Sequence, residues 1–220
     1  MLTLLAQAIS TLVCLAAVAV ASFVFLDGSL RRAFLLAIFK RLAQKYPPAY
    51  AIVGDSLATQ SDWRSLGRHP LDVINLAKGG ATIKEIAGQA LEARDLGARC
   101  VVIDGGLNDL LFDEAPIEQI EYDFRALLRR IGANAHAIVT LMPYVADPAL
   151  APRIDAANRV IGALAKERGF AVVDLNPRLS SHGARKSEMT DDGLHFTPLA
   201  SSIWVEAVRA AASGEAGLAS

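Results

Sequence analysis

Residues 51–57 have the sequence AIVGDSL, a short apolar run followed by a glycine, an aspartate and a serine. Short runs rich in β-branched residues favour buried strands, and four similar runs follow this one along the chain. The segments between them carry apolar residues at steps of three and four, which predicts helices. The predicted strands are residues 51–53, 73–76, 100–104, 137–141 and 171–175, and the main predicted helices are residues 83–96, 117–131, 154–168 and 198–212.

This alternation of strands and helices predicts the fold class. Strands that are apolar along their whole length are typical of a parallel sheet covered by helices on both faces. We therefore expect an α/β protein, a flavodoxin-like three-layer α/β/α sandwich around a five-stranded parallel sheet. Such sheets bind ligands at the carboxyl ends of their strands. Residues that follow the strands are thus the first candidates for a functional site.

The composition fits one domain and argues against nucleic-acid binding. A chain of 220 residues is long enough for one well-buried core once a targeting segment is set aside. Its 22 basic and 23 acidic residues leave a net charge of −1, so no overall field attracts a polyanion. The two cysteines, Cys14 and Cys100, form neither a disulfide framework nor a metal-ligand pattern. We expect no cofactor and no metal, and the oligomeric state stays open.

The first 26 residues contain no charged side chain. A membrane-spanning helix needs about 20 mostly apolar residues, whereas a secretory signal starts with basic residues and has an apolar core of about 7–15. The length favours an uncleaved transmembrane helix over residues 1–28, which would anchor the protein to a membrane by a single pass. Small-residue pairs such as Ala17 and Ala19 leave a cleaved signal peptide as the alternative, and a buried helix is the third interpretation.

Basic residues follow this segment. We interpret residues 29–48 as a basic juxtamembrane linker that ends at Pro47-Pro48, because proline stops a helix. Basic flanks tend to stay on the cytoplasmic side, whereas a cleaved signal would export the domain, so the side of the membrane is open. The globular domain is then residues 49–213, and residues 214–220 are a flexible tail.

The first group of residues that could carry out chemistry follows the first strand. Gly54-Asp55-Ser56-Leu57 places a serine at the carboxyl edge of the sheet, on the turn into a helix. A glycine allows a sharp turn, and the backbone N–H groups at a helix start stabilise negative charge. Ser56 is therefore a candidate nucleophile; the alternative is that it only caps the helix.

The second group is Asp192-Gly193-Leu194-His195, after the fifth strand. Two intervening residues let both side chains meet on one turn, where a carboxylate can orient an imidazole that takes a proton from a serine. Asp191 is the competing carboxylate, one residue further from His195. The other three histidines lie in segments that favour structural or solvated roles: His69, His136 and His182.

A third group, Gly105-Gly106-Leu107-Asn108-Asp109, follows the third strand. An asparagine amide at this edge can donate to an oxyanion, and glycines let the backbone approach a substrate closely. The same residue types are also ordinary turn formers. After the second strand, Gly79-Gly80 either supplies a backbone N–H to the same anion or only turns the chain.

These four elements, in this order, resemble the sequence blocks of the SGNH (GDSL-type) hydrolase family. The matching residues are Gly54-Asp55-Ser56-Leu57, Gly80 within residues 75–82, Gly106-Leu107-Asn108-Asp109, and Asp192 to His195. The resemblance extends over about residues 50–212, and Ala200 departs from it where many members have glycine. The α/β-hydrolase elbow G-x-S-x-G does not fit, because Ala58 takes the place of its second glycine.

The resemblance implies roles for these residues. Ser56 would attack the acyl carbonyl, His195 would act as general base and then acid, and Asp192 would orient His195. The resemblance assigns the oxyanion hole to three donors: the Ser56 N–H, the Gly80 N–H and the Asn108 side chain. Gly79 remains the alternative to Gly80.

The implied function is that of a serine hydrolase, a GDSL/SGNH-type serine esterase that cleaves carboxylic (acyl) esters through an acyl-enzyme. Lysophospholipids, thioesters and acetylated carbohydrates are the implied substrate classes, and a membrane tether favours lipid or glycan esters. The alternatives are an acyltransferase that passes the acyl group to sugar hydroxyls, and a catalytically silent membrane-anchored binding protein. Short segments between the blocks predict an open, shallow site. Leu110, Leu111, Phe112 and residues 142–145 are candidates for an apolar wall of this site, and the alternative is that they pack in the core.

Overall fold

The computed structural model describes residues 28–132 and 136–214 of the chain, so the predicted anchor and tail lie outside the described residues except for Gly28 and Gly214. The chain divides into two units, residues 1–41 and 42–220. Helix α2 (Gly28–Ala43) occupies most of the segment that the sequence predicted as a linker. Within the described ranges, no helix is long and apolar enough to cross a membrane.

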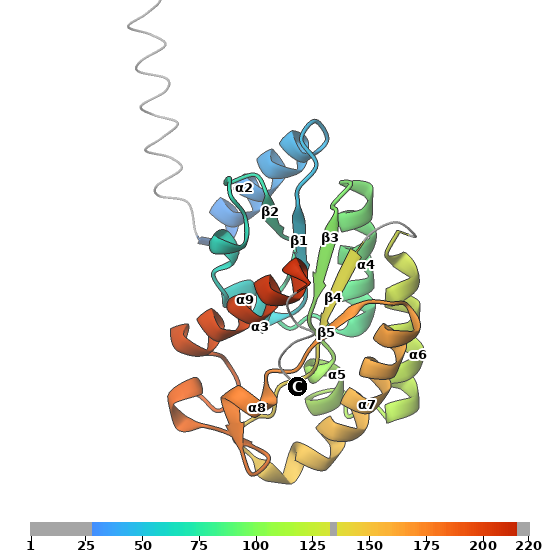
Figure 1. Ribbon diagram of the computed structural model, residues 1–220, viewed down its shortest axis with the longest axis vertical. Helices are drawn as coiled ribbons and strands as arrows, with labels where there is room; N and C mark the ends of the chain where they lie inside the picture. The colour runs from blue at the N-terminus through green and yellow to red at the C-terminus, as the bar shows by residue number, and fades with distance from the viewer. Residues whose placement is uncertain (1–27, 133–135, 215–220) are drawn as a thin grey trace, which may run out of the picture. The chain divides into compact units, whose positions relative to one another are not determined.

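The second unit contains the predicted five-stranded sheet, in which every pairing is parallel. The order β2-β1-β3-β4-β5 can be followed in Figure 1. The strands are β1 (Tyr50–Val53), β2 (Val73–Asn75), β3 (Cys100–Ile103), β4 (His136–Thr140) and β5 (Ala171–Val173). Their bounds differ from the predicted ones by at most two residues, so the α/β fold class and the parallel sheet are confirmed.

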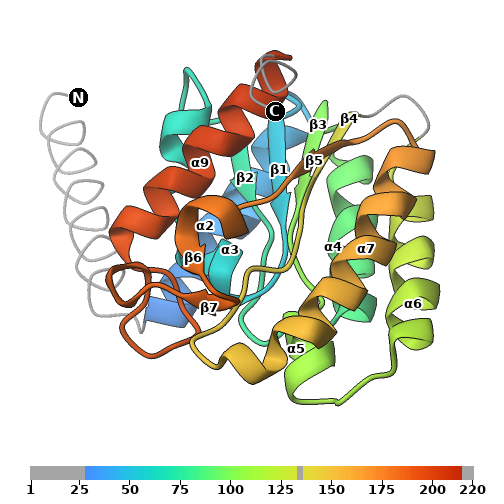
Figure 2. The ribbon, with the colours of Figure 1, turned by 60° about the horizontal axis from the view of Figure 1, so that its bottom comes forward.

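Helices cover both faces of this sheet, as the apolar strands require. Figure 2 shows α4, α6 and α7 on one side of the sheet and α9 on the other. The bounds are α4 (Ile83–Asp95), α6 (Ile117–Arg130), α7 (Ala151–Glu167) and α9 (Pro198–Ser213). Helix α7 begins three residues earlier than predicted because Pro152 falls in its first turn, where the missing N–H costs no hydrogen bond.

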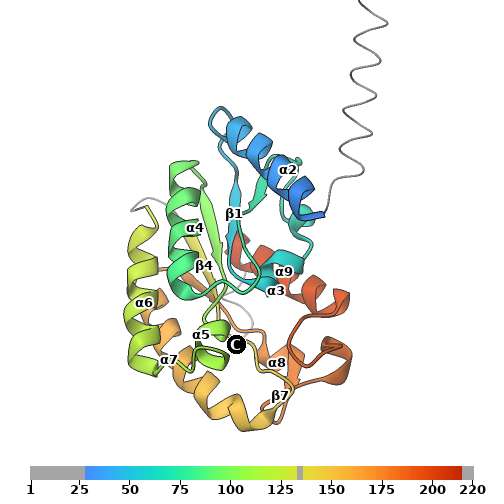
Figure 3. The same cartoon turned by 180° about the vertical axis from the view of Figure 1, so that it is seen from behind.

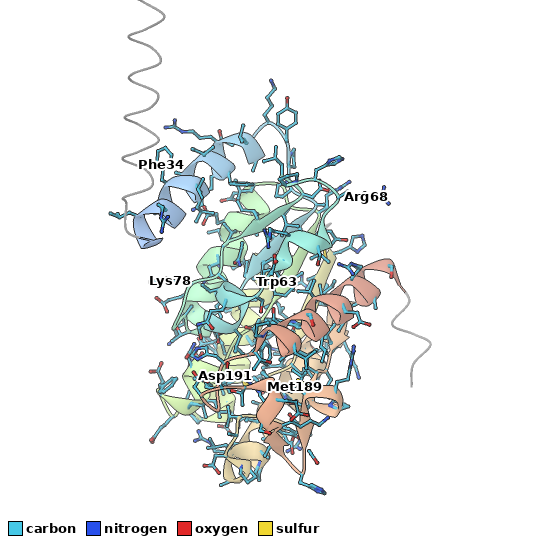
Figure 4. The ribbon with its side chains drawn as sticks, turned by 90° about the vertical axis from the view of Figure 1, so that its left-hand side faces the viewer. Phe34, Trp63, Arg68, Lys78, Met189 and Asp191 are labelled. Carbon is cyan, nitrogen blue, oxygen red and sulfur yellow. The ribbon has the colours of Figure 1, made fainter. Side chains whose placement is uncertain are left out.

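The buried stripe of each helix explains how it packs. In α4 the buried residues are Ile83, Ile86, Ala90 and Ala93, at steps of three and four. On the other face, α9 buries Trp204, whose indole Nε1 donates to Thr140 Oγ1 at the end of β4 at 2.9 Å. The ring of Trp63, labelled in Figure 4, meets Trp204 edge-on with centroids 4.8 Å apart. Trp63 belongs to the 3₁₀ helix η1 (Trp63–Leu66).

The turn after β1 was predicted to lead into a helix, and this helix is α3 (Ser56–Gln60). The other short elements could not be predicted, because a helix of fewer than two turns or a strand of two residues gives no periodic pattern. They are α5 (Leu107–Leu111), α8 (Asn176–Leu179), the 3₁₀ helices η1, η2 (Pro148–Leu150) and η3 (Ser187–Met189), and the hairpin of β6 (Ser180–Ser181) and β7 (Ala184–Arg185). Figure 3 shows α3 and α5 at the same end of the sheet, where β1 and β3 end. The register pairs Val53 with Ile103, so the residues that follow these two positions are neighbours.

Candidate active site

The candidate nucleophile, Ser56, is the first residue of α3 and lies at the carboxyl edge of the sheet. Asp55 precedes the helix, and its Oδ1 accepts a hydrogen bond from the backbone N–H of Leu57 at 2.9 Å. Asp55 is therefore the cap of this helix. The alternative that Ser56 is the cap is wrong, and its hydroxyl is left for other contacts.

Gly54 brings the end of β1 close to the end of β3. A Cβ atom at this position would lie 2.9 Å from Ala58 Cβ and 3.1 Å from Asp104 Cβ, so a larger residue does not fit. Gln89 of α4 holds the same glycine: its Oε1 accepts from the Gly54 N–H at 2.7 Å, and its Nε2 donates to the Gly54 carbonyl at 3.1 Å. Our sequence analysis missed Gln89, although a polar residue three positions after Ile86, on the apolar stripe of α4, was an available signal.

The structure brings the predicted serine, histidine and aspartate together. His195 Nε2 lies 3.0 Å from Ser56 Oγ, although the two residues are 139 positions apart in sequence. On the other side of the ring, His195 Nδ1 lies 2.6 Å from Asp192 Oδ2. With Nδ1–H donating to the carboxylate, Nε2 is free to accept the serine proton, which is the arrangement of a proton-transfer triad.

Asp192 is fixed by the turn that it closes. Its Oδ1 accepts from the backbone N–H groups of Leu194 at 2.9 Å and His195 at 2.7 Å. The hydrogen bond from the His195 ring, followed by these two backbone bonds, holds the pKa of Asp192 well below its ordinary value. Among the hydrogen bonds of the described residues, none joins Asp191 to His195, and Figure 4 labels Asp191 on this loop.

Asn108 lies on α5, beside the nucleophile turn. Its Nδ2 donates to the Ala81 carbonyl at 3.0 Å and to Asp55 Oδ2 at 3.2 Å, so both amide hydrogens have partners. The next residue, Asp109, accepts from the Ile83 N–H through both carboxylate oxygens, at 3.2 and 3.0 Å. These contacts tie α5 to the start of α4 and fix the asparagine at the strand edge.

The two glycines after β2 differ in their distance from the nucleophile. A Cβ atom on Gly79 would lie 3.9 Å from Ser56 Cβ, whereas one on Gly80 would have no neighbour within 4 Å. Gly80 has a φ of 74°, in the left-handed region that favours glycine. A side chain at Gly79 would thus point toward Ser56, whereas one at Gly80 would point into open space, and both backbone N–H groups remain candidate donors.

Two buried charged residues near the site escaped the sequence analysis. Asp104 follows β3, and burial raises its pKa well above the ordinary value, with a further increase from the charge of Asp55. Burial also raises the pKa of Asp55 itself. Arg185 on β7 is only 4% exposed, and burial lowers its pKa to about 10. Asp104 could have been predicted as a residue near the site, because it lies at the end of a strand. Arg185 could not, because a strand of two residues gives no pattern in the sequence.

The predicted apolar wall is only partly present. Four of its residues are buried in the core and cannot line an open site: Leu110, Met142, Pro143 and Val145. Phe112 is 67% exposed, and Leu111 and Tyr144 are partly exposed. The Tyr144 hydroxyl donates to Asp155 Oδ1 at 2.5 Å, and this bond raises the pKa of Tyr144 to about 12.

The remaining histidines lie apart from this geometry, since His69, His136 and His182 are all exposed. Within residues 28–132 and 136–214, no group of three or more histidine, cysteine, aspartate or glutamate side chains is arranged to hold a metal ion. The side chains at the strand edge are a serine, an imidazole, carboxyl groups and an amide.

A family model described as the GDSL-like lipase/acylhydrolase family matches residues 42–202. Among solved structures, a GDSL-like lipase from Bacteroides thetaiotaomicron is 19% identical with a TM-score of 0.65, and the match covers 82% of this chain and 99% of that one. A lipase/acylhydrolase from Enterococcus faecalis is 20% identical with a TM-score of 0.64, covering 76% and 96%. The psychrotrophic esterase EstA from Pseudoalteromonas sp. is 16% identical with a TM-score of 0.59, covering 76% and 97%. The comparison with curated proteins gave no match.

Proposed function

Because this chain belongs to the GDSL-like lipase/acylhydrolase family and is an ester-hydrolysing enzyme, we propose that Ser56, His195 and Asp192 are its catalytic triad. The observation that carries the proposal is the continuous contact from Ser56 Oγ to His195 Nε2 at 3.0 Å and from His195 Nδ1 to Asp192 Oδ2 at 2.6 Å. The substrates would be acyl esters, cleaved through an acyl-enzyme.

Acylation and deacylation both use His195 as the proton carrier. Ser56 Oγ bonds to the acyl carbon while its proton moves to His195 Nε2, and the carbonyl oxygen becomes an oxyanion. As this intermediate collapses, the alcohol oxygen leaves and takes the proton from His195. A water molecule then attacks the acyl carbon, gives a proton to His195, and the carboxylic acid departs as that proton returns to Ser56 Oγ. Asp192, whose pKa is low, stays ionised and stabilises the imidazolium in both steps.

The oxyanion would be held by the backbone N–H of Ser56, the N–H of Gly80 or Gly79, and the Asn108 amide. Both amide hydrogens of Asn108 have partners, so one must be released to the oxyanion. The 3.2 Å bond to Asp55 is the longer and weaker of the two. We propose that this hydrogen turns from Asp55 to the oxyanion, which makes the interaction specific to the transition state.

Exposure of the triad favours water as the acyl acceptor. The His195 side chain is 31% exposed and that of Asp192 is 54% exposed, so solvent reaches the edge of the imidazole. The same openness admits acyl groups of different kinds, including lysophospholipid, thioester and acetylated-carbohydrate substrates. Transfer to a sugar hydroxyl would need the acceptor to outcompete water, and a product assay with added sugar distinguishes the two reactions.

The test is labelling with a fluorophosphonate followed by peptide mapping, together with hydrolysis of a p-nitrophenyl ester. We expect the label on Ser56 alone and a decrease in kcat of about 10⁴-fold or more in Ser56→Ala. Ser202→Ala is the matched control, because this exposed serine of α9 bonds only its own helix through its side chain. A folded protein that takes no label, or an active Ser56→Ala variant, would favour a binding protein over an enzyme with this triad.

We further propose that residues 1–26 anchor the enzyme to a membrane, with lipid or glycan esters as its neighbours. The support is the absence of any charged side chain in this run, which is long enough to span a bilayer. Deletion of residues 1–26 is expected to move the esterase activity from the membrane fraction to the soluble fraction of a cell lysate. Activity that stays with the membranes would contradict the anchor. Protease accessibility of the intact protein in sealed vesicles would establish the side on which the domain lies.

A further inference from the structure

Arg185 is an unusual residue to find in the interior, because arginine is almost never fully buried without a partner. It lies on β7, whose pairing with β6 forms a two-stranded hairpin. The backbone N–H of Arg185 donates to the Val145 carbonyl at 2.9 Å, which ties the hairpin to the loop after β4. Figure 2 shows this hairpin at the end of the sheet to which α3 and α5 also belong.

The guanidinium group contacts the two residues on either side of His195. Its Nη1 donates a hydrogen bond to the Leu194 carbonyl. Its plane lies over the ring of Phe196, with 4.6 Å from the guanidinium carbon to the ring centroid. Since the Leu194 N–H already donates to Asp192, both peptide groups of Leu194 and the side chain of Phe196 are held, and His195 lies between them.

Two guanidinium nitrogens of Arg185, Nε and Nη2, are buried without a hydrogen-bond partner among the described residues, and the charge of Arg185 has two acidic neighbours. It is attracted by Asp104 at the end of β3 and by Asp192 of the triad. Asp104 is the neighbour of Gly54, on the strand edge that carries the nucleophile. The charge of Arg185 is thus near both the carboxyl group beside Gly54 and the carboxylate that contacts His195.

The aromatic contacts extend this connection to the nucleophile helix. Phe196 meets Trp204 edge-on with centroids 5.5 Å apart, and Trp204 meets Trp63 at 4.8 Å. The indole Nε1 of Trp63 donates to the carbonyl of Ala58, two residues after Ser56, at 2.8 Å. The ring of Phe196 therefore lies between a guanidinium on one side and a row of rings that ends on α3 on the other.

From these contacts we infer that Arg185 is a positioning residue, which holds His195 at hydrogen-bonding distance from Ser56 by fixing Leu194 and Phe196. This inference rests on the proposed triad. Arg185 does not touch the reacting atoms, so its loss leaves the acyl ester free to bind. It acts on the chemical step, because a shift of about 1 Å between base and nucleophile costs about 10²-fold in rate.

The experiment compares Arg185→Met, Arg185→Lys and the control Arg178→Met in the full-length protein. Arg178 is half exposed and pairs with Glu206 on α9. Each variant is titrated to completion with a fluorophosphonate, so that kcat for a p-nitrophenyl ester is expressed per reactive Ser56. This normalisation removes the effect of an unfolded fraction, which is all that a merely structural role would change.

We expect Arg185→Met to lower kcat about 10–100-fold with KM changed less than about threefold. Arg185→Lys keeps the charge but not the planar fork, and should recover only part of this loss; Arg178→Met should match the wild type. A wild-type kcat per site in Arg185→Met, or in Arg185→Lys if the methionine variant does not fold, would overturn the positioning role. Failure of the triad itself would appear differently, as a wild-type protein that takes no label on Ser56.

Discussion

The two halves of the active site are built in different ways. On the nucleophile side, Gly54 and Asp55 directly follow a central strand, and Asp55 is 2% exposed and bonded to both Leu57 and Asn108. On the base side, the Asp192 side chain is 54% exposed and lies on a loop about twenty residues beyond the last strand of the sheet. The serine is thus placed by the sheet, whereas the histidine is placed by hydrogen bonds within its own turn and by Arg185.

The buried carboxyl groups, Asp55 and Asp104, and the exposed carboxylate, Asp192, differ in their pKa values. Burial raises the pKa values of Asp55 and Asp104, and Asp55 accepts hydrogen bonds from the Leu57 N–H and the Asn108 amide. Hydrogen bonds from a histidine and two backbone N–H groups lower the pKa of Asp192, which keeps it charged beside the imidazole. The buried carboxyl groups therefore belong to the nucleophile side, and the exposed carboxylate belongs to the base side.

Among variants that leave the three triad residues in place, the largest effect should come from the nucleophile side, at Asn108. We expect Asn108→Ala to lower kcat by about 10²–10³-fold. The variant loses the fixed amide donor to the oxyanion, and a water molecule in its place is a weaker donor because it is not held in position. KM should change less, since the interaction is made in the transition state. Steady-state kinetics on titrated sites would measure this, and an unchanged kcat would remove Asn108 from the oxyanion hole.

A smaller effect tests how rigidly the strand edge holds the nucleophile. Gly54→Ala would place a Cβ atom 2.9 Å from Ala58 Cβ and 3.1 Å from Asp104 Cβ. We expect a loss of about 1–3 kcal/mol in the free energy of unfolding, as for other overpacked positions. Gly88→Ala is the control: it lies in α4 with no atom within 4 Å of a new Cβ, and should stabilise the protein by about 0.5–1 kcal/mol. Equal unfolding midpoints in denaturant for the two variants would argue against a tight turn at Gly54.

Local patterns in the sequence were sufficient to predict Ser56 and Asn108 on the nucleophile side, although not Gln89 or Asp104. Five short apolar runs located the strand ends, and a serine or an asparagine directly after a strand must lie at the carboxyl edge of the sheet. The Asp-x-x-His spacing likewise predicted the contact between Asp192 and His195, since three positions bring both onto one turn. Only the meeting of this turn with Ser56 had to come from the resemblance.

What the sequence could not supply are the contacts between distant segments. Arg185 lies in a polar stretch with no periodicity, and its contact with Phe196 depends on a hairpin of two-residue strands. Phe112 and Leu110 are both large and apolar, yet Leu110 on α5 is in the core, whereas Phe112, the residue after this helix ends, is 67% exposed. Burial at such positions is decided by tertiary packing, which no local pattern records.

The smallest effect is on the pH dependence of stability, which should differ in sign between the exposed Asp192 and the buried Asp104. The folded-state pKa of Asp192 lies below its ordinary value of 3.8, so its contribution to stability is present above that pH and is lost as the pH falls through the folded pKa. Asp192→Asn, which keeps an oxygen for the two backbone N–H groups, should therefore be less stable than the wild type at pH 6. That difference should shrink below pH 3.8, and it should be under about 1 kcal/mol because the group is exposed.

Asp104 should behave in the opposite way. Its folded-state pKa lies above 3.8, so the folded protein takes up a proton that the unfolded chain releases, and the cost grows as the pH rises above that value. The stability of Asp104→Asn relative to the wild type should therefore increase between pH 4 and pH 7, where that of Asp192→Asn stays level or declines. Thermal unfolding of the three proteins across this range measures both trends. Parallel trends would mean that the two carboxylates do not differ in the way their burial and hydrogen bonds imply, and that the nucleophile and base sides share one electrostatic design.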